Sequence, residues 1–273
     1  MKVVLFCGGF GTRLREHSET IPKPMVCIGS RPILWHLMRY YAHFGHNEFI
    51  LCLGYRGDLI KQFFLNYDEC LSNDFVFARG GRDVQLFKRD IDDWKITFAD
   101  TGLQANIAER LKAVEPYLDD DEMFLANYAD GLSDLDLNAY IENFKRQSAA
   151  VAGFIAVRPS YYSFHMVSLG PNDYVADIRD MKSSDVWING GYFVLRREIF
   201  DFIHQGDELA AETFRRLVGK QALYAQRHTG FWQCMDTLKD KMVFDDMAAK
   251  GETPWTLWQN GDGAPRRAPR RRV

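Results

Sequence analysis

The sequence lacks the features that identify several common classes of protein. No apolar run among its 273 residues approaches the ~20 that a membrane-spanning helix needs. No Gly-Lys pair is followed by Ser or Thr, so the P-loop of many nucleotide-binding proteins is missing. A dinucleotide-binding fingerprint is also missing, because Leu14 stands where its third glycine belongs. We therefore expect no membrane partner and neither of these two common phosphate loops.

Paired cysteines are missing as well. The five cysteines are widely spaced without a Cys-x-x-Cys pair, and neither they nor the seven histidines show the spacing of zinc ligands. Cys7 and Cys52 fall inside apolar, strand-like runs, which is typical of buried, reduced thiols. The N-terminal residues do not show the basic, apolar and cleavage-site pattern of a signal peptide. These features together predict a cytoplasmic protein.

Basic stripes are absent from the body of the chain. The net charge is −3, but five arginines and one aspartate lie in residues 261–273, so this end contributes +4 and the remainder −7. Residues 259–273 have few apolar side chains and are rich in Gly, Pro and Arg, so we expect a disordered basic tail. An acidic body without basic stripes argues against nucleic acid as a partner.

The most informative segment that is present lies near the N-terminus. The apolar run Val3–Cys7 predicts a buried strand, and Gly8-Gly9-Phe10-Gly11-Thr12-Arg13 follows it. A glycine-rich turn lets backbone N–H groups approach one anion closely, and Arg13 and Lys23 add positive charge. Glycines alone would favour an ordinary strand-to-helix turn. Together with the two cations and Pro22-Lys23-Pro24, they predict a nucleoside triphosphate site.

Strand-like and helix-like segments alternate along the chain. This alternation is typical of an α/β fold with a mostly parallel sheet and helices on both faces, and we expect a single domain over residues 1–258. In such sheets ligands collect at the carboxyl ends of the strands. The predicted strands cover residues 2–7, 48–53, 75–78, 95–99, 123–128, 149–157, 175–181 and 192–195. The predicted helices cover residues 32–44, 58–67, 107–118, 137–147 and 237–250.

Two aspartates stand where a metal site is expected. Asp130 directly follows the predicted strand 123–128, and Asp236 precedes the last predicted helix. Two carboxylates can hold one Mg²⁺ together with phosphate oxygens and waters. Each aspartate also fits a turn or a helix cap, and capping is a serious alternative for Asp236.

Longer motifs resemble a known family over nearly the whole chain, to about Trp258. The glycine-rich run, Pro22-Lys23-Pro24-Met25 and Ile33-Leu34-Trp35-His36 are similar to sugar-1-phosphate nucleotidyltransferases. The resemblance narrows to the glucose-1-phosphate cytidylyltransferase family with further segments, of which the run from Gly230 to Gln233 and Met235-Asp236-Thr237-Leu238 are the most specific. The remaining segments are Gly54-Tyr55-Arg56-Gly57, Asp100-Thr101-Gly102, Arg110-Leu111-Lys112, Tyr128-Ala129-Asp130-Gly131, Ile188-Asn189-Gly190-Gly191 through Leu195, and Pro254-Trp255.

The resemblance implies a reaction and a set of site residues. An oxygen of a sugar phosphate attacks the α-phosphorus of CTP, which releases pyrophosphate. It implies a Rossmann-like, mostly parallel mixed sheet flanked by helices, a nucleotide half of about residues 1–130, and a smaller acceptor-binding, C-terminal half of about residues 131–258. The implied nucleotide-binding residues are Gly8, Gly9, Gly11, Thr12, Arg13, Lys23, Arg110 and Asp130. The implied catalytic residues are Arg13, Lys23, Asp130 and Asp236, the last two as ligands of Mg²⁺.

The acceptor side departs from the family pattern. The usual Glu-Lys-Pro triplet before Asn189 is replaced, so Lys182 or Arg179 stands in for its lysine. An expected Arg-Phe-Gly segment on the same side is replaced by residues 161–166. A third departure lies near the expected base site, where residues 107–110 replace the usual Thr-Gly-Gly-Arg. The acceptor-binding residues that we expect are Tyr162, His165, Arg179, Lys182, Asn189 and Gly190, with Asn189 bonded to a sugar hydroxyl and His165 as a polar lining residue.

The sequence therefore predicts a Mg²⁺-dependent transfer of CMP from CTP to a sugar 1-phosphate or a related phosphate or phosphonate. Two alternatives stay open. The same chemistry can use UTP, dTTP or GTP, since the segment near the base is altered, or the chain can be a catalytically silent nucleotide-binding homologue. The resemblance also implies a homo-oligomer, with residues 70–95 as one contact.

Overall fold

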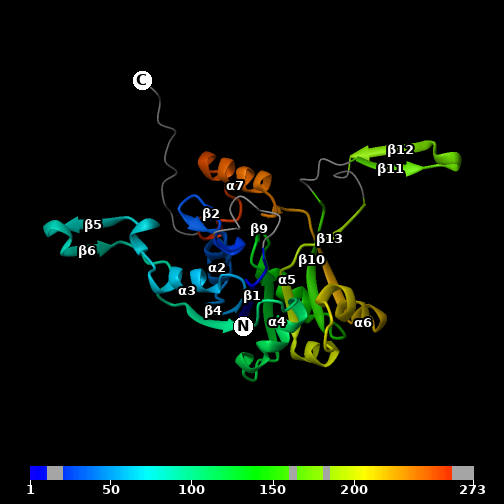
Figure 1. The fold of residues 1–273 in the computed structure, drawn as a ribbon, viewed down its shortest axis with the longest axis horizontal. Helices are drawn as coiled ribbons and strands as arrows, with labels where there is room; N and C mark the ends of the chain where they lie inside the picture. The colour runs from blue at the N-terminus through cyan, green and yellow to red at the C-terminus, as the bar shows by residue number, and fades with distance from the viewer. Residues whose placement is uncertain (11–20, 160–164, 181–184, 260–273) are drawn as a thin grey trace.

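A central sheet of eight strands organises the computed structural model, which describes residues 1–10, 21–159, 165–180 and 185–259 (Figure 1). The strands of this sheet are β1 (Val3–Phe6), β4 (Glu48–Leu53), β7 (Lys95–Asp100), β8 (Met123–Tyr128), β10 (Ala152–Val157), β13 (Ile188–Asn189), β14 (Phe193–Arg196) and β15 (Leu223–His228). The helices are α2 (Ile33–His43), α3 (Gly57–Leu65), α4 (Ile107–Ala113), α5 (Leu137–Lys145), α6 (Phe214–Gly219) and α7 (Leu238–Lys250). The predicted α/β class is confirmed.

The pairing of the sheet is mixed. Strands β8, β1, β4 and β7 run parallel to their neighbours, so their carboxyl ends share one edge. On the other side of β8, strand β14 pairs in the antiparallel direction with both β8 and β10. Strand β13 is also antiparallel to β10 and pairs with the end of the edge that β14 occupies. Strand β15 pairs in parallel with the far side of β10. The sheet is therefore parallel from β8 through β1 and β4 to β7, and mixed on the other side of β8.

Successive residues of β1 serve two hydrophobic cores, one on each face of the sheet. Val3 and Leu5 pack into the core that also contains residues of α2, α5 and α7. Val4 and Phe6 pack into the core built with α4 and α6. Alternation with a period of two residues places neighbouring side chains on opposite faces. Both faces are covered by helices, which explains why this strand is apolar throughout.

Most predicted elements lie where the sequence places them. Strands β4 and β8 have the predicted bounds, and the ends of α2, α3, α5 and α7 lie within two residues of the predicted ones. The helix predicted over residues 107–118 ends at Ala113, and a 3-10 helix covers Glu115–Leu118. Pro116 explains the difference, because it cannot donate a backbone hydrogen bond within an α-helix.

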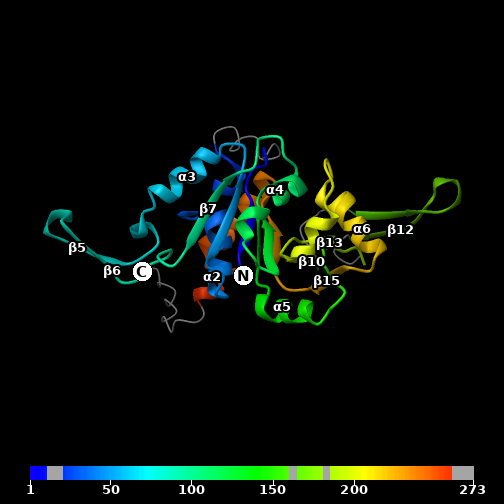
Figure 2. The same ribbon diagram turned by 90° about the horizontal axis from the view of Figure 1, so that it is seen from below.

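Short strands extend the fold beyond the central sheet. Strand β9 (Gly131–Ser133) pairs with β16 (Trp232–Cys234), and β2 (Cys27–Ile28) pairs with β3 (Arg31–Pro32). Two further hairpins project from opposite ends of the molecule, β5–β6 from one and β11–β12 from the other (Figures 1 and 2). They span Phe75–Ala78 with Asp83–Leu86, and His165–Leu169 with Val175–Asp180.

The C-terminal segment returns to α2. His36 Nε2 lies 3.1 Å from the carbonyl oxygen of Ile28, and Trp255 Nε1 lies 3.4 Å from His36 Nδ1. Trp255 is buried and packs its ring on Phe231 and Phe244. The imidazole therefore connects α2 to the last described residues. Among the described helices, none has the length and apolar character needed to cross a membrane.

Candidate active site

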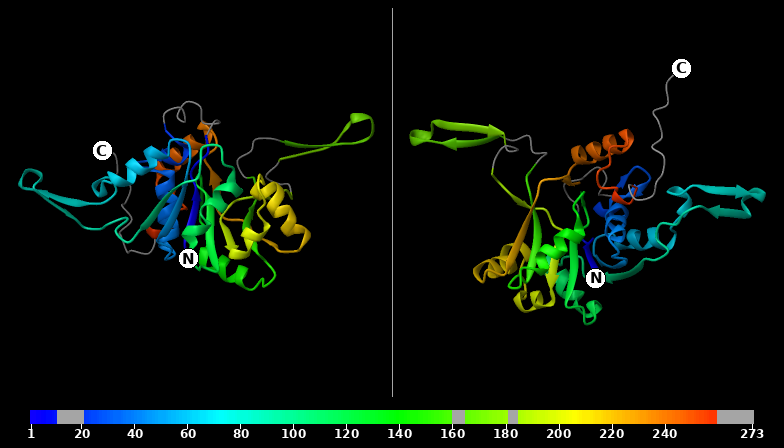
Figure 3. Two further views of the ribbon diagram at one scale, coloured as in Figure 1. Left: turned by 60° about the horizontal axis from the view of Figure 1, so that its bottom comes forward. Right: turned by 180° about the vertical axis from the view of Figure 1, so that it is seen from behind.

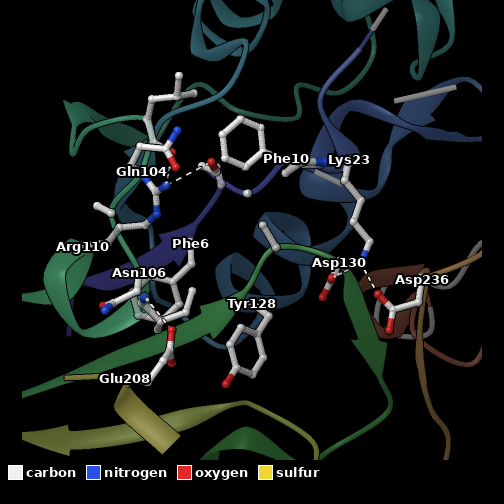
Figure 4. Close-up of a pocket in the computed structure, with 18 residues that line it drawn as sticks. Phe6, Phe10, Lys23, Gln104, Asn106, Arg110, Tyr128, Asp130, Glu208 and Asp236 are labelled. Atoms are coloured by element: carbon white, nitrogen blue, oxygen red, sulfur yellow. Dashed lines mark hydrogen bonds and ion pairs between the residues drawn. The ribbon is translucent and has the colours of Figure 1, made fainter. Parts of the chain in front are cut away.

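A cleft of about 420 Å³ opens at the shared carboxyl edge of the parallel strands. The residues after β1 and β8 line it, and α4 and the segment before α7 close its sides (Figure 4). It is the place where an open α/β sheet binds ligands. Its lining residues are Phe6, Cys7, Gly8, Gly9, Phe10, Lys23, Pro24, Leu103, Gln104, Ala105, Asn106, Ile107, Arg110, Tyr128, Ala129, Asp130, Glu208 and Asp236.

Gly8 is a site of close packing. A Cβ atom at this position would lie 2.1 Å from Arg110 Nη1, which no real contact allows. A Cβ at Gly54 would lie 2.7 Å from the carbonyl oxygen of Gly8. In contrast, a Cβ at Gly9 would meet no atom within 4 Å. Glycine is therefore needed at positions 8 and 54 because the guanidinium group lies against the backbone there.

The guanidinium group of Arg110 is held by oxygens of the protein. Its Nη1 donates to the carbonyl oxygens of Leu53 and Gly102 at 3.1 and 2.9 Å and to Thr101 Oγ1 at 2.7 Å. Its Nη2 donates to the carbonyl oxygen of Gly8 at 3.0 Å. Arg110 is only 2% exposed. The side chain that we expected beside the base, ribose or phosphates thus borders the cleft and also fixes the loop that follows β1.

Lys23 meets both predicted metal ligands. It begins a 3-10 helix (Lys23–Met25) that follows Pro22. Its Nζ lies 2.5 Å from Asp130 Oδ2 and also contacts Asp236 Oδ1 (Figure 4). Burial by itself lowers the pKa of Lys23, but the two carboxylates outweigh burial and the net pKa is raised. The lysine is therefore a firmly charged ammonium group between two carboxylates.

Strand pairing brings the two carboxylates together. Asp130 immediately precedes β9, Asp236 follows β16 by two residues, and the register places Cys234 opposite Gly131. The N–H of Met235 donates to the carbonyl oxygen of Asp130 at 2.8 Å. Residues more than a hundred positions apart thus become neighbours.

Asp236 does not cap α7. The N-cap is Thr237, whose side chain accepts from the N–H of Asp240 at 3.2 Å, and the carboxylate of Asp240 accepts in turn from the N–H of Thr237. The side chain of Asp236 instead points toward Lys23 (Figure 4). The capping alternative for this aspartate is therefore wrong.

The arrangement of Asp130 and Asp236 fits a magnesium ion that is completed by a substrate. Both carboxylates reach one nitrogen atom of Lys23, so they can also reach one cation. Mg²⁺ commonly takes one or two carboxylates and fills its octahedron with waters and substrate phosphates. In the described part of the chain, no group of three or more His, Cys, Asp or Glu side chains could form a complete protein cage. The donor set suits Mg²⁺ bound to a nucleotide better than an isolated structural metal.

Of the predicted acceptor residues, Asn189 and Gly190 lie next to this region. Asn189 Oδ1 accepts from the N–H of Gly191 at 2.9 Å, and Gly191 lies against the ring of Tyr128, since a Cβ there would lie 3.2 Å from Tyr128 Cδ2. Gly190 is buried, and a Cβ there would lie 2.9 Å from Ile155 Cγ1. Gly190 therefore supports the backbone by close packing.

The structure does not bring His165 and Arg179 to the cleft. Both lie on the projecting hairpin β11–β12, with exposed side chains, and neither lines the cleft. The guanidinium group of Arg179 pairs with Asp177 on the same strand. The other predicted site residues lie outside the described residues: Gly11, Thr12, Arg13, Tyr162 and Lys182.

The lining residues that were not predicted as site residues include four with polar side chains, Gln104, Asn106, Tyr128 and Glu208. Asn106 forms a capping box with Glu109 at the start of α4, a pattern that is visible in the sequence. Glu208 lies 101 positions from Ile107, whose N–H it faces at 3.4 Å, and no sequence signal joins them. Tyr128 ends β8, and burial raises its pKa to about 12, with Glu208 and Asp130 adding to the rise. Its hydroxyl is therefore a neutral hydrogen-bonding group in the cleft.

Residues 2–240 match the family model described as Nucleotidyl transferase. The chain belongs to this nucleotidyl transferase family. Glucose-1-phosphate cytidylyltransferase from Salmonella typhi is 37% identical over 261 residues, which cover 95% of this chain and all of that protein. Mannose-1-phosphate guanyltransferase from Yarrowia lipolytica is 26% identical and covers 88% of this chain, with 62% of its own length matched. The resemblance to cytidylyltransferases that the motifs predict is thus confirmed.

Solved structures agree on the nucleotidyltransferase fold. HddC from Yersinia pseudotuberculosis superposes with a TM-score of 0.64 at 21% identity, over 90% of this chain and 99% of its own. A UDP-glucose pyrophosphorylase in complex with UDP-glucose gives a TM-score of 0.65 at 13% identity, over 92% of this chain and 98% of its own. At these identities the likeness concerns the fold alone.

Proposed function

We propose that this nucleotidyltransferase moves CMP from CTP to a sugar 1-phosphate, forming a CDP-sugar and pyrophosphate. The observation that carries the proposal is the 37% identity to a glucose-1-phosphate cytidylyltransferase over that protein's whole length. The cluster of Lys23, Asp130 and Asp236 in the cleft supports it. UTP, dTTP and GTP are the alternative donors.

The chemistry asks mainly for positioning and charge stabilisation. A phosphate oxygen of the acceptor attacks the α-phosphorus of CTP and forms the new P–O bond. The bond from the α-phosphorus to the bridging oxygen breaks, and pyrophosphate leaves with its electron pair. The attacking phosphate is ionised at neutral pH and needs no general base. The protein must align two anions and offset their repulsion.

The residues of the cleft suit these tasks. Gly8 and Gly9 line the cleft, and their N–H groups are proposed to bind the phosphates, while Lys23 supplies a fixed cation at the α-phosphate or the incoming phosphate. Asp130 and Asp236 are proposed to hold Mg²⁺, which when bound neutralises charge on the phosphate oxygens. Arg13 is proposed to hold the triphosphate. Charged donors of this kind stabilise phosphoryl transfer without proton exchange.

The acceptor is bound by the second half of the chain in this proposal. Asn189 is proposed to bond a sugar hydroxyl, since its Oδ1 accepts from the N–H of Gly191, which lies against the cleft residue Tyr128. Lys182 remains the candidate for the acceptor-side cation and Tyr162 a candidate contact, because Arg179 and His165 lie on the projecting hairpin β11–β12 away from the cleft. We also propose that the protein forms a homo-oligomer and acts in the cytoplasm, as the sequence predicts.

The experiment is an assay of pyrophosphate release from purified protein with Mg²⁺ and one of CTP, UTP, dTTP or GTP. The acceptors are glucose 1-phosphate and a panel of other sugar phosphates and phosphonates. We expect release with CTP to exceed release with the other triphosphates. If no triphosphate releases pyrophosphate with any acceptor of the panel, a catalytically silent nucleotide-binding homologue is favoured. Calorimetry of each triphosphate then shows which nucleotide the protein binds most tightly, and so tests CTP against UTP, dTTP and GTP.

A further inference from the structure

The cleft has two chemically different ends. Lys23 and the two proposed metal ligands lie at one end, and Gln104, Asn106 and Glu208 lie at the other (Figure 4). The phosphates carry the charge of a nucleotide and its base is neutral. A nucleotide bound here therefore places its triphosphate at the first end and its base at the second, where the base can be selected.

Glu208 reaches the second end from a distant part of the chain. It directly precedes a π-helix (Leu209–Thr213), which packs against α4 at the side of the cleft (Figure 3). Its Oε1 lies 3.4 Å from the backbone nitrogen of Ile107, the first residue of α4, and its Oε2 accepts from the N–H of Leu209 at 3.0 Å. Backbone groups of two different elements thus hold the carboxylate in place.

The charge of Glu208 is uncompensated in this place. Within the described residues its carboxylate contacts backbone N–H groups, and no Lys or Arg forms an ion pair with it. Burial raises the pKa of Tyr128 and the charge of Glu208 adds to the rise, so the carboxylate lies close to a side chain that lines the cleft. A carboxylate here repels a triphosphate unless the nucleotide supplies a compensating hydrogen bond.

The carboxylate has acceptor capacity left for such a bond. An ionised carboxylate has no donor and about four acceptor sites, of which the N–H groups of Ile107 and Leu209 use two. The free acceptor sites of Glu208 therefore suit an N–H or O–H donor of the ligand.

The pyrimidine bases differ in what they offer to a carboxylate. Cytosine carries an amino group, N4, where uracil and thymine carry the carbonyl oxygen O4. A carboxylate attracts the amino group and repels the carbonyl oxygen. Gln104 has both a donor and an acceptor group and can pair with either base. Asn106 Oδ1 already accepts from the N–H of Glu109 at 2.9 Å, so its amide offers donors. Of these three side chains, Glu208 is the one that favours cytosine.

We propose that Glu208 accepts a hydrogen bond from the 4-amino group of cytosine and thereby selects CTP over UTP and dTTP. The inference rests on the proposed function, because it names the residue that sets the choice of triphosphate in that reaction. The contact forms no covalent bond and transfers no proton. Glu208 therefore determines specificity and takes no part in the chemical step.

The test is Glu208→Gln, which replaces the carboxylate by a neutral amide of the same shape. Calorimetry with Mg²⁺ and each of CTP, UTP, dTTP and GTP measures binding, and pyrophosphate release with glucose 1-phosphate measures kcat/KM. We expect CTP to bind more weakly and UTP more tightly, so that the preference for CTP falls by about 10- to 100-fold, the usual effect of a hydrogen bond to a charged group. Glu208→Ala should reduce the same preference, and far-ultraviolet circular dichroism checks that each variant is folded.

Two controls separate this contact from a general effect of charge. Glu212→Gln removes the same charge four residues away, at an exposed position that does not line the cleft. Its Oε2 accepts from the N–H of Glu208 at 2.8 Å, a bond that glutamine can keep. The preference for CTP should not change in this variant. A CTP analogue with hydrogen in place of the 4-amino group should bind the wild type and Glu208→Gln about equally.

Other outcomes overturn the inference. A wild type that binds CTP and UTP equally, or an unchanged preference in Glu208→Gln, leaves Glu208 as a link between the π-helix and α4. Equal weakening of CTP and UTP, without an effect on 2′-deoxy-CTP, assigns the carboxylate to a ribose hydroxyl. A larger effect on GTP than on CTP assigns it to the amino group of guanine.

Failure of the proposed function gives a different result. In that case the wild type binds CTP most tightly and loses this preference in Glu208→Gln, but releases no pyrophosphate with any acceptor. Such a protein is a silent homologue in which Glu208 still selects the base. Normal release from CTP together with an unchanged preference in Glu208→Gln refutes the role of Glu208 alone.

Discussion

The ammonium nitrogen of Lys23 lies 2.5 Å from Oδ2 of Asp130, although 107 residues separate them. The same nitrogen contacts Asp236, so one positive charge faces two negative charges. A divalent cation that used both carboxylates would meet the ammonium group at close range. If Mg²⁺ binds as proposed, Lys23 would therefore have to move away from the two carboxylates, toward a phosphate. The lysine is both a proposed substrate contact and a competitor of the metal.

Lys23→Met is expected to strengthen metal binding in the absence of nucleotide while it abolishes most turnover. A unit charge at 4 Å is worth about 4 kcal/mol at an effective dielectric constant of about 20. Since about 1.4 kcal/mol corresponds to a tenfold change, we expect Mn²⁺ to bind at least about tenfold more tightly. Electron paramagnetic resonance of free Mn²⁺ measures this. Lys250→Met, which removes a surface ion pair with Asp246, is the control and should change nothing. Unchanged or weaker Mn²⁺ binding in the Lys23 variant would contradict the competition.

Asp236→Ala and Thr237→Ala are expected to separate catalysis from helix capping. Loss of the Asp236 carboxylate removes a proposed metal ligand, so we expect turnover to fall by about 10²–10³-fold, the usual effect of losing one electrostatic stabiliser. Loss of the Thr237 cap should lower the free energy of unfolding by about 1 kcal/mol and leave most turnover intact. Steady-state kinetics and urea unfolding of both variants measure the two effects. A near-normal rate for Asp236→Ala would remove this aspartate from the reaction.

The sequence predicted the parallel half of the fold and the main site residues because their signals are local. The apolar run of β1, the glycines after it and Asp130 after β8 each stand in one short window, and the shared edge of parallel strands then brings them together. The pairing of β9 with β16 could not be predicted in this way, because it joins three-residue segments about a hundred positions apart. Glu208 was missed for the same reason, since its neighbour Ile107 lies in another part of the chain.

The projecting hairpins show a different limit of sequence reasoning. His165 and Arg179 were expected at the acceptor site from their place in a family pattern, but the structure puts them on β11–β12. Apolar residues at every second position of a strand predict that one face of the strand packs against another surface. They do not show whether that surface belongs to the same chain. The apolar side chains of this hairpin remain exposed within one chain.

Gly8→Ala is expected to disturb the cleft, whereas Gly9→Ala is not. The new methyl group at position 8 would overlap the guanidinium group of Arg110, which several backbone oxygens hold in place. Overpacking of this kind costs about 1–3 kcal/mol. We expect a lower free energy of unfolding and weaker binding of CTP, measured by urea unfolding and calorimetry. Gly9 is the matched control, because a methyl group there meets no atom within 4 Å. Equal effects of the two substitutions would show that Arg110 can move freely.

The imidazole of His36 is expected to make stability depend on pH. Burial lowers the pKa of His36 to about 4, although the hydrogen bond to the carbonyl oxygen of Ile28 by itself raises it. In the unfolded chain the pKa is about 6.5, so the unfolded state binds the proton first as pH falls. The contribution of the neutral ring is complete above about pH 6.5 and is lost as pH falls toward 4, by at most about 3 kcal/mol.

Urea unfolding of the wild type and of His36→Gln at pH 7, 6 and 5 measures this contribution. The wild type should lose more stability between pH 7 and 5 than the variant, because the glutamine side chain can donate to Ile28 but does not titrate. Burial also lowers the pKa of His46 to about 4, so both proteins should retain a smaller slope from that residue. His43→Gln, at an exposed position of α2, is the control and should follow the wild type. Identical pH profiles for the wild type and His36→Gln would mean that His36 takes up its proton in the folded protein as readily as in the unfolded chain.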